Sequence, residues 1–271
     1  MYCKQKNTIN ENDLELRIII GEDCNLNCSY CTTKKTNRSF NKIDELLIFI
    51  NRLTFKNFTI EFMGGESLLY IKNILKIILE IEKIVPRFHI KIITNGELLS
   101  QKNIQTILII INKKQSLLLM VSIHNEIPNL NWLKNNKVNF YTSKPIDSNE
   151  DLDDNADIDD IDDIFPTFFN YNGLEKTKKY TKEIIYDDNL IDLHELFKIT
   201  KFNFKNWKCN SGKNLICIDV DGLVYPCPMY LIYRLNGINM EDFVQKETIC
   251  NVDECWEFTS ERKINEYTTK E

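Results

Sequence analysis

The region that decides the fold reads LRIIIGEDCNLNCSYC and covers residues 16–31. Its first five residues are rich in β-branched side chains and predict a buried strand. Directly after that strand, Cys24, Cys28 and Cys31 form a C-x3-C-x2-C pattern. Three thiolates from one loop can bind three irons of a four-iron cluster and leave the fourth iron open. A structural zinc site would need a fourth ligand, and no histidine lies within fifty residues of this loop.

Strand patterns alternate with helix patterns on the C-terminal side of this region. Apolar, β-branched runs predict strands, and apolar residues at helical spacing predict the helices between them. Such alternation is typical of parallel βα units, so the sequence predicts an α/β fold, a partial (βα)6 parallel barrel. The expected strands are 16–20, 58–63, 88–93, 117–123, 138–142 and 164–170, and the expected helices are 43–53, 69–85, 103–112 and 130–134, with a linking helix at 190–199.

Polar motifs follow the expected strands in turn. Gly64-Gly65-Glu66 comes after the second strand, Thr94-Asn95-Gly96 after the third, and Ser122 ends the fourth. Each motif alone could be an ordinary turn or a surface hydroxyl. Together they fall at the carboxyl ends of parallel strands, where sites form in barrels and open α/β sheets.

A second group of cysteines lies in the last quarter of the chain. Asp221-Gly222 between short apolar runs predicts a two-residue hairpin turn, which would pair Cys217 with Pro226 and put Cys217 and Cys227 on opposite faces. A shift of one residue in register would bring these two cysteines together. Taken alone, the segment suits a zinc ribbon as well as an iron–sulfur cluster. The group consists of Cys209, Cys217, Cys227, Cys250 and Cys255.

Composition and charge limit the possible partners of the chain and its location in the cell. A formal net charge of −6 argues against a general nucleic-acid binder. No apolar run approaches the roughly 20 residues of a membrane span, and residues 1–12 have no apolar signal core, so we expect a cytoplasmic protein. Eight aspartates lie in residues 151–163, which we interpret as a solvated acidic loop. Nine cysteines in a cytoplasmic chain point to metal ligands, with Cys3 as a plain thiol.

The motifs together resemble the radical S-adenosylmethionine (SAM) enzymes. The first cysteine loop has the family's spacing, with the aromatic Tyr30 before its third cysteine. Gly64, Gly65 and Glu66 look like the glycine-rich motif that meets the methionine amino group. The resemblance implies that Asn95 contacts the nucleoside side and Ser122 the ribose or carboxylate. Ser67 stands where the family often has proline.

The hairpin and its cysteines resemble the SPASM and twitch domains that follow many radical SAM barrels. The resemblance implies a second, auxiliary [4Fe-4S] cluster in a small C-terminal α+β domain. We favour Cys209, Cys227, Cys250 and Cys255 as its ligands, with Cys217 as a rival. The expected division is a barrel over 14–172 with an acidic loop at 147–163, a linker region over 173–204, and the auxiliary domain over 205–260.

The resemblance also implies an activity. A reduced [4Fe-4S] cluster would cleave SAM to a 5′-deoxyadenosyl radical, which would abstract hydrogen from a peptide, a protein or a small molecule. A reductant such as flavodoxin or ferredoxin would supply the electron. His124 and Tyr225 are the catalytic candidates. Pro228 replaces the aspartate of sulfatase-maturating relatives. The alternative is a non-catalytic or degenerate metal-binding module that holds zinc or an iron–sulfur cluster.

Overall fold

A computed structural model describes most of the first hundred residues and selected segments of the rest. The described residues are 13–28, 31, 35–100, 102–103, 106, 108, 116–122, 133, 135, 138–143, 184–186, 189–191, 205–206, 208–232, 235–251 and 264–266. The expected acidic loop and the expected strand at 164–170 lie outside them.

Parallel strands form the centre of the molecule, as the sequence predicts. The first five strands pair in parallel in chain order, from β1 with β2 to β4 with β5. Their carboxyl ends therefore lie at one edge of the sheet. The strands are β1 (Asp13–Gly21), β2 (Asn57–Gly64), β3 (His89–Thr94), β4 (Ser116–Ser122) and β5 (Asn139–Ser143).

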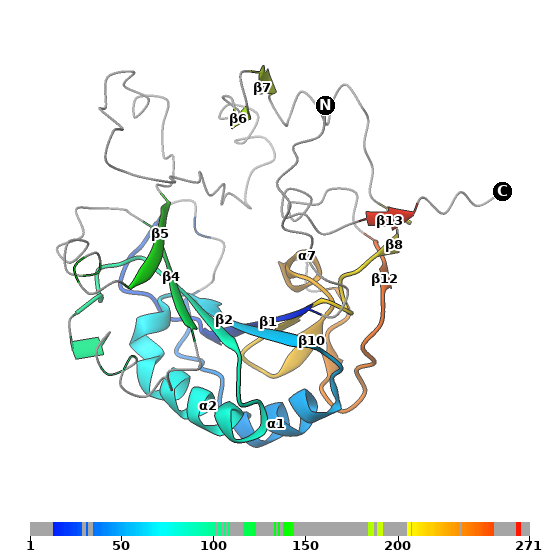
Figure 1. Ribbon diagram of the computed structural model, residues 1–271, viewed down its shortest axis with the longest axis horizontal. Helices are drawn as coiled ribbons and strands as arrows, with labels where there is room; N and C mark the ends of the chain where they lie inside the picture. Colours follow the sequence, from blue (N-terminus) through cyan, green and yellow to red (C-terminus); the bar gives the residue numbers. More distant parts are fainter. Residues whose placement is uncertain are drawn as a thin grey trace.

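Helices cover one face of this sheet (Figure 1). They are α1 (Ile43–Arg52), the 3-10 helix η1 (Ser67–Tyr70) and α2 (Ile71–Ile84). The two predicted helices in this part of the chain are confirmed. Farther along, Lys102, Asn103, Thr106 and Leu108 are helical, as are Leu133 and Asn135. In the part of the chain that the structure describes, no helix is long and apolar enough to cross a membrane.

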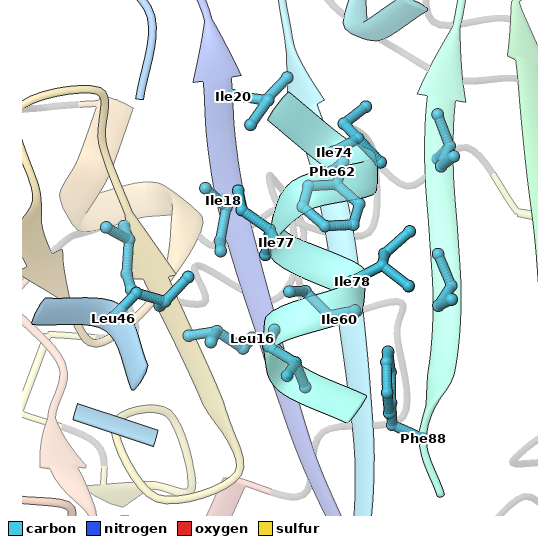
Figure 2. Packing of buried hydrophobic residues seen from close by; sticks show 14 of the residues in the cluster. Leu16, Ile18, Ile20, Leu46, Ile60, Phe62, Ile74, Ile77, Ile78 and Phe88 are labelled. Atoms are coloured by element: carbon cyan, nitrogen blue, oxygen red, sulfur yellow. The ribbon is translucent and has the colours of Figure 1, made fainter. Parts of the chain in front are cut away.

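The hydrophobic core lies between the helices and the sheet (Figure 2). Alternate residues of β1, such as Leu16 and Ile18, are fully buried against Ile77 and Ile78 of α2 and their neighbours. Burial of such a side chain stabilises the fold by about 1.5–3 kcal/mol. Asp13, Glu15, Arg17 and Ile19 alternate with these residues, face the opposite side of the sheet and are half-buried. This packing fixes the strands whose ends carry the polar motifs.

The C-terminal hairpin belongs to the same sheet as the first half of the chain. Strand β9 (Leu215–Ile218) pairs in parallel with β1, and β10 (Leu223–Tyr225) and β11 (Ile238–Asn239) follow it in antiparallel order. The complete order is β11-β10-β9-β1-β2-β3-β4-β5. The second cysteine group is thus attached directly to the strand that carries the first.

Short elements complete the described chain. Strands β8 (Lys208–Cys209), β12 (Thr248–Ile249) and β13 (Ile264–Glu266) form a small sheet, and α7 (Pro228–Ile232) follows the hairpin. Strands β6 (Ile184–Tyr186) and β7 (Asn189–Ile191) pair in antiparallel fashion. The predicted helix at 190–199 is therefore wrong at its first two residues. Apolar and aromatic side chains on either side of a two-residue polar connection favour a hairpin there.

Candidate functional site

The first cysteine group lies on the loop that leaves β1, as predicted. Among the described residues, no disulfide involves Cys24, Cys28 or Cys31; the first two are half-buried and Cys31 is exposed. The backbone N–H of Cys31 donates to the carbonyl of Cys28 at 3.2 Å. Burial raises the pKa of Cys24, and a backbone hydrogen bond from Leu26 partly offsets this rise. Tyr30 lies outside the described residues.

Gly64 and Gly65 hold the base of this loop. The N–H of Gly65 donates to the carbonyl of Gly21 at 2.9 Å, and the N–H of Glu66 donates to that of Asp23 at 2.8 Å. A Cβ on Gly64 would lie 2.2 Å from the Gly21 oxygen, and one on Gly65 would lie 2.1 Å from the Asp23 oxygen. Only glycines allow so close an approach, and Gly64 also has a φ of 142°. The glycine-rich motif therefore contacts the cysteine loop itself.

The carboxylate of Glu66 is fully buried and bound by the protein. Its Oε1 accepts hydrogen bonds from the N–H of Leu68 at 2.8 Å and from the hydroxyl of Thr94 at 2.7 Å. Its Oε2 accepts from the N–H of Asn95 at 2.7 Å. Burial raises the pKa of Glu66, while these hydrogen bonds counteract the rise. The side chain thus links the end of β2 to the end of β3; its expected bond to a methionine ammonium stays a prediction.

Asn95 continues the link from β3 back to the cysteine loop. Its Nδ2 donates to Oδ1 of Asn25 at 2.8 Å and faces Sγ of Cys24 at 3.8 Å. Asn25 in turn donates to Oε2 of Glu97 at 2.7 Å. Hydrogen bonds therefore run from the cysteine loop through the exits of β2 and β3. The hydrogen bond between Asn25 and Glu97 has no signal in the sequence, because the two residues are 72 positions apart and occupy variable or flanking positions of their motifs.

Ser122 ends β4 on the same edge of the sheet. It is half-buried, as are Leu118 and Met120 on its own face of the strand, and it pairs in register with Ser143 of β5. Its position agrees with the expected site, while its contact with a cofactor stays a prediction. His124 lies outside the described residues.

The second cysteine group gathers Cys209, Cys227 and Cys250. Strand pairing of β8 with β12 places Cys209 opposite Thr248, two residues before Cys250. Burial is the main cause that raises the pKa of Cys227 to about 12, and the neighbouring Cys209 and Cys250 contribute to this rise. Burial likewise raises the pKa of Tyr230 to about 12, with contributions from the same three thiols. Three of the four favoured ligands are therefore neighbours, and Cys255 lies outside the described residues.

The hairpin register differs from the expected one. Cys217 pairs with Tyr225 rather than with Pro226, because the connection has three residues rather than two. Asp219 causes the difference: its N–H donates to the carbonyl of Leu223, and its Oδ1 accepts from the N–H groups of Asp221 and Leu223. Gly222 closes the loop at a φ of 78°. The predicted two-residue turn is therefore wrong.

This register places Cys217 and Cys227 in one buried cluster with Leu215, Tyr225 and Met229. Cys217 is fully buried there, which keeps it as a rival ligand. The hydroxyl of Tyr225 donates to Oδ2 of Asp219 at 3.1 Å, and the residue is only 4% exposed. Tyr225 thus stabilises the hairpin, and its catalytic role stays a prediction.

An ion-pair network joins the two cysteine regions. Arg38 donates to both carboxylate oxygens of Glu22, at 2.9 and 2.8 Å, and to Oδ2 of Asp221 at 2.6 Å. Glu22 lies at the base of the first cysteine loop and Asp221 in the hairpin turn. Sequence analysis missed this link. Among the described residues, no group of three His, Cys, Asp or Glu side chains is arranged to hold a single metal ion.

Comparison with known families bears on this geometry. Residues 18–117 match the Radical SAM superfamily. The matched segment contains the first cysteine loop, Gly64-Gly65-Glu66 and Thr94-Asn95-Gly96, which are the parts of the chain that the hydrogen bonds join. No curated protein matches the chain in sequence.

Solved structures share the radical SAM fold. The structure of anSMEcpe with bound AdoMet and Cp18Cys peptide is 17% identical, with a TM-score of 0.54, over 85% of this chain and 78% of that one. BtrN in complex with AdoMet and 2-DOIA is 17% identical, with a TM-score of 0.51, over 85% of this chain and 80% of that one. At these identities the likeness shows the fold. The superfamily match itself covers residues 18–117 of the chain.

Proposed function

We propose that the chain is a radical SAM enzyme that cleaves SAM reductively and abstracts hydrogen from a peptide, protein or small molecule. The observation that carries this proposal is the set of hydrogen bonds that ties the cysteine loop to Gly65, Glu66 and Asn95. These residues come from three successive parallel strand ends, where α/β folds build their sites. The superfamily match over residues 18–117 includes all of them.

The first cysteine loop fits an iron–sulfur cluster. Cys24, Cys28 and Cys31 would hold three irons of a [4Fe-4S] cluster, and all three are at least partly exposed. Metal ligation requires the thiolate, so binding would release the proton that burial favours on Cys24. When bound, the cluster and SAM supply a carbon-centred radical for hydrogen abstraction.

We propose that SAM binds over this loop beside Tyr30, Gly64, Gly65, Asn95 and Ser122. We propose that Glu66 also meets the methionine ammonium, since its carboxylate accepts three hydrogen bonds inside the protein and has capacity for about four. It would in addition fix the backbone of Asn95 and the base of the cysteine loop. The exposed parts of the loop remain open to the cofactor.

The second cysteine group would hold an auxiliary [4Fe-4S] cluster in a SPASM-like or twitch-like region over 205–260, after a barrel over 14–172 and a linker over 173–204. Cys209, Cys227 and Cys250 are its core ligands, and either Cys255 or Cys217 is the fourth. The proximity of the first three supports this. The auxiliary cluster would accept the electron left after hydrogen abstraction or orient the substrate.

The substrate is proposed at the level of class. Of the solved structures with this fold, anSMEcpe holds a peptide and BtrN holds 2-DOIA. We propose a peptide or small molecule, with flavodoxin or ferredoxin as the reductant. Cell extract from deuterium-grown cells, split by a size filter, would separate the two classes. The fraction that transfers deuterium to 5′-deoxyadenosine contains the substrate.

The experiment that tests the proposed function is anaerobic reconstitution followed by reduction with dithionite in the presence of SAM. We expect about eight irons per chain, from two four-iron clusters, and formation of 5′-deoxyadenosine. The rival function is a non-catalytic metal-binding module. It predicts zinc in place of iron, or a bound cluster with no cleavage of SAM.

A further inference from the structure

The side-chain amide of Asn95 lies between the exit of β3 and the cysteine loop. Its Oδ1 accepts a hydrogen bond from the N–H of Glu97 at 3.1 Å. Its Nδ2 donates to Oδ1 of Asn25 at 2.8 Å and lies 3.8 Å from Sγ of Cys24. An amide nitrogen carries two hydrogens, so one can serve Asn25 while the other points at the sulfur.

The protein fixes the direction of this amide. The N–H of Glu97 can only donate, so it requires the oxygen of Asn95 on its side and the nitrogen on the side of Cys24. The backbone of Asn95 is held as well, because its own N–H donates to the buried carboxylate of Glu66 at 2.7 Å. Asn95 itself is only 8% exposed. The N–H group is therefore aimed at Cys24 before any cluster binds.

A chain of hydrogen bonds supports the donor. Asn25 donates to Oε2 of Glu97 at 2.7 Å and accepts from Asn95 at 2.8 Å. Each hydrogen bond in such a chain polarises the next. The amide nitrogen of Asn95 is thus shared between the side-chain oxygen of Asn25 and the sulfur of Cys24. Its orientation depends on the cysteine loop and on Glu97 after β3.

We propose that Asn95 is a positioning residue that donates an N–H···S hydrogen bond to the Cys24 thiolate and thereby raises the reduction potential of the bound cluster. This inference rests on the proposed function, because it requires that Cys24 ligates iron. Reduction adds negative charge to the cluster and its sulfurs. A donor at the sulfur therefore stabilises the reduced state more than the oxidised one.

The test is a redox titration of reconstituted full-length protein, followed by electron paramagnetic resonance (EPR) on the signal that changes when SAM is added. Asn95→Leu removes the donor at similar size, and Asn95→Asp replaces the donor with a negative oxygen. We expect the midpoint potential to fall in both variants, and to fall further in Asn95→Asp. Asn103→Leu is the matched control, because the side chain of Asn103 donates to the carbonyl of Leu98; its midpoint should equal that of the wild type.

The outcomes separate this inference from the proposed function. If either Asn95 variant binds wild-type iron and keeps the signal at an unchanged midpoint, the inference is overturned and the proposed function stands. If the wild-type protein binds no reducible cluster, both are overturned. Because a structural role alone would not shift the potential of an intact cluster, a lower midpoint in both variants with normal iron content supports the inference.

Discussion

The two cysteine regions differ in how the chain holds them. The first lies on a loop whose base is bound by backbone and side-chain hydrogen bonds from the exits of β2 and β3, and its Cys31 is exposed. The second centres on Cys227, which is buried with Tyr225 and Met229 in an apolar cluster. Polar contacts position the first region, whereas apolar packing positions the second.

This difference indicates that the two cysteine regions have different functions. A loop that is fixed at its base and open at its surface suits a centre that must exchange a cofactor and receive electrons. A buried thiol whose pKa is raised to about 12 suits a group that stays in place. We therefore expect SAM cleavage at the first region. We expect the second region to accept the electron or to orient the substrate.

The largest expected effect comes from removing the first region's ligands. A triple Cys24, Cys28, Cys31→Ala variant should lose all cleavage of SAM and about half of the iron, because each region would hold one four-iron cluster. The measurement is iron content together with 5′-deoxyadenosine after reduction. Cys3→Ala is the control and should match the wild type. Retention of full iron by the triple variant would refute a cluster at this loop.

Removing Cys227 should abolish substrate conversion and leave SAM cleavage in place. Cys227→Ala should still form 5′-deoxyadenosine slowly with dithionite but convert no substrate, because SAM binding is assigned to the strand exits. An intact EPR signal from the first cluster must show that the variant is folded, since a cluster also stabilises a small segment. Substrate conversion at the wild-type rate by the folded variant would reduce the second region to a scaffold.

Thiol alkylation should sharpen the contrast in metal-free protein. At pH 8, a pKa of about 12 leaves only about one in ten thousand Cys227 groups as thiolate. Iodoacetamide should therefore label exposed Cys31 at least about 100-fold faster than Cys227, as followed by peptide mass spectrometry. Because the thiolate fraction grows with pH below the pKa, Cys227 labelling should rise about tenfold from pH 8 to 9. In urea-unfolded protein the two rates should converge; equal rates in folded protein would contradict the burial of Cys227.

Glu66→Gln should weaken the junction between β2 and β3. Gln has one accepting oxygen where Glu66 has two, so either the N–H of Asn95 or the N–H of Leu68 loses its buried partner. We expect a loss of about 1–3 kcal/mol in the free energy of unfolding, measured in urea, and weaker SAM binding with the cluster retained. Glu80→Gln on the exposed face of α2 is the control. Unchanged stability and SAM affinity would leave the motif as a simple turn.

Asp221→Asn should have the smallest effect. It removes the negative charge of the ion pair between Arg38 and the hairpin, and both side chains of this pair are well exposed. Such pairs contribute about 0.2–1 kcal/mol and weaken with salt. The difference in unfolding free energy from the wild type should therefore shrink at high salt. A loss well above this range would mean that the two cysteine regions are strongly coupled through Arg38.

The sequence predicts the order of the strands and the positions of the motifs at their ends because those features depend on local patterns. The apolar run before Cys24 predicts a strand from neighbouring residues alone, and Gly64 and Gly65 predict a turn in the same way. The partners of these motifs could not be predicted in the same way. That Gly65 approaches Asp23 and that Glu66 binds Asn95 depend on strands meeting in space.

The hairpin register could not be predicted from the sequence either, although its residues are close together in the chain. Asp221-Gly222 favours a two-residue turn, but the side chain of Asp219 accepts two backbone N–H groups and lengthens the loop by one residue. That change moves Cys217 to the face of Cys227. Side-chain capping of this kind competes with turn preferences and is decided by which hydrogen bonds the folded loop can complete.

The most direct test of the central claim is EPR spectroscopy of reduced, reconstituted Cys227→Ala protein before and after addition of SAM. The account predicts one remaining cluster signal, from the loop of Cys24, Cys28 and Cys31, that changes shape when SAM is added and is followed by release of 5′-deoxyadenosine. A remaining signal that SAM does not alter, with no 5′-deoxyadenosine formed, would contradict the assignment of an open cluster to the first cysteine region.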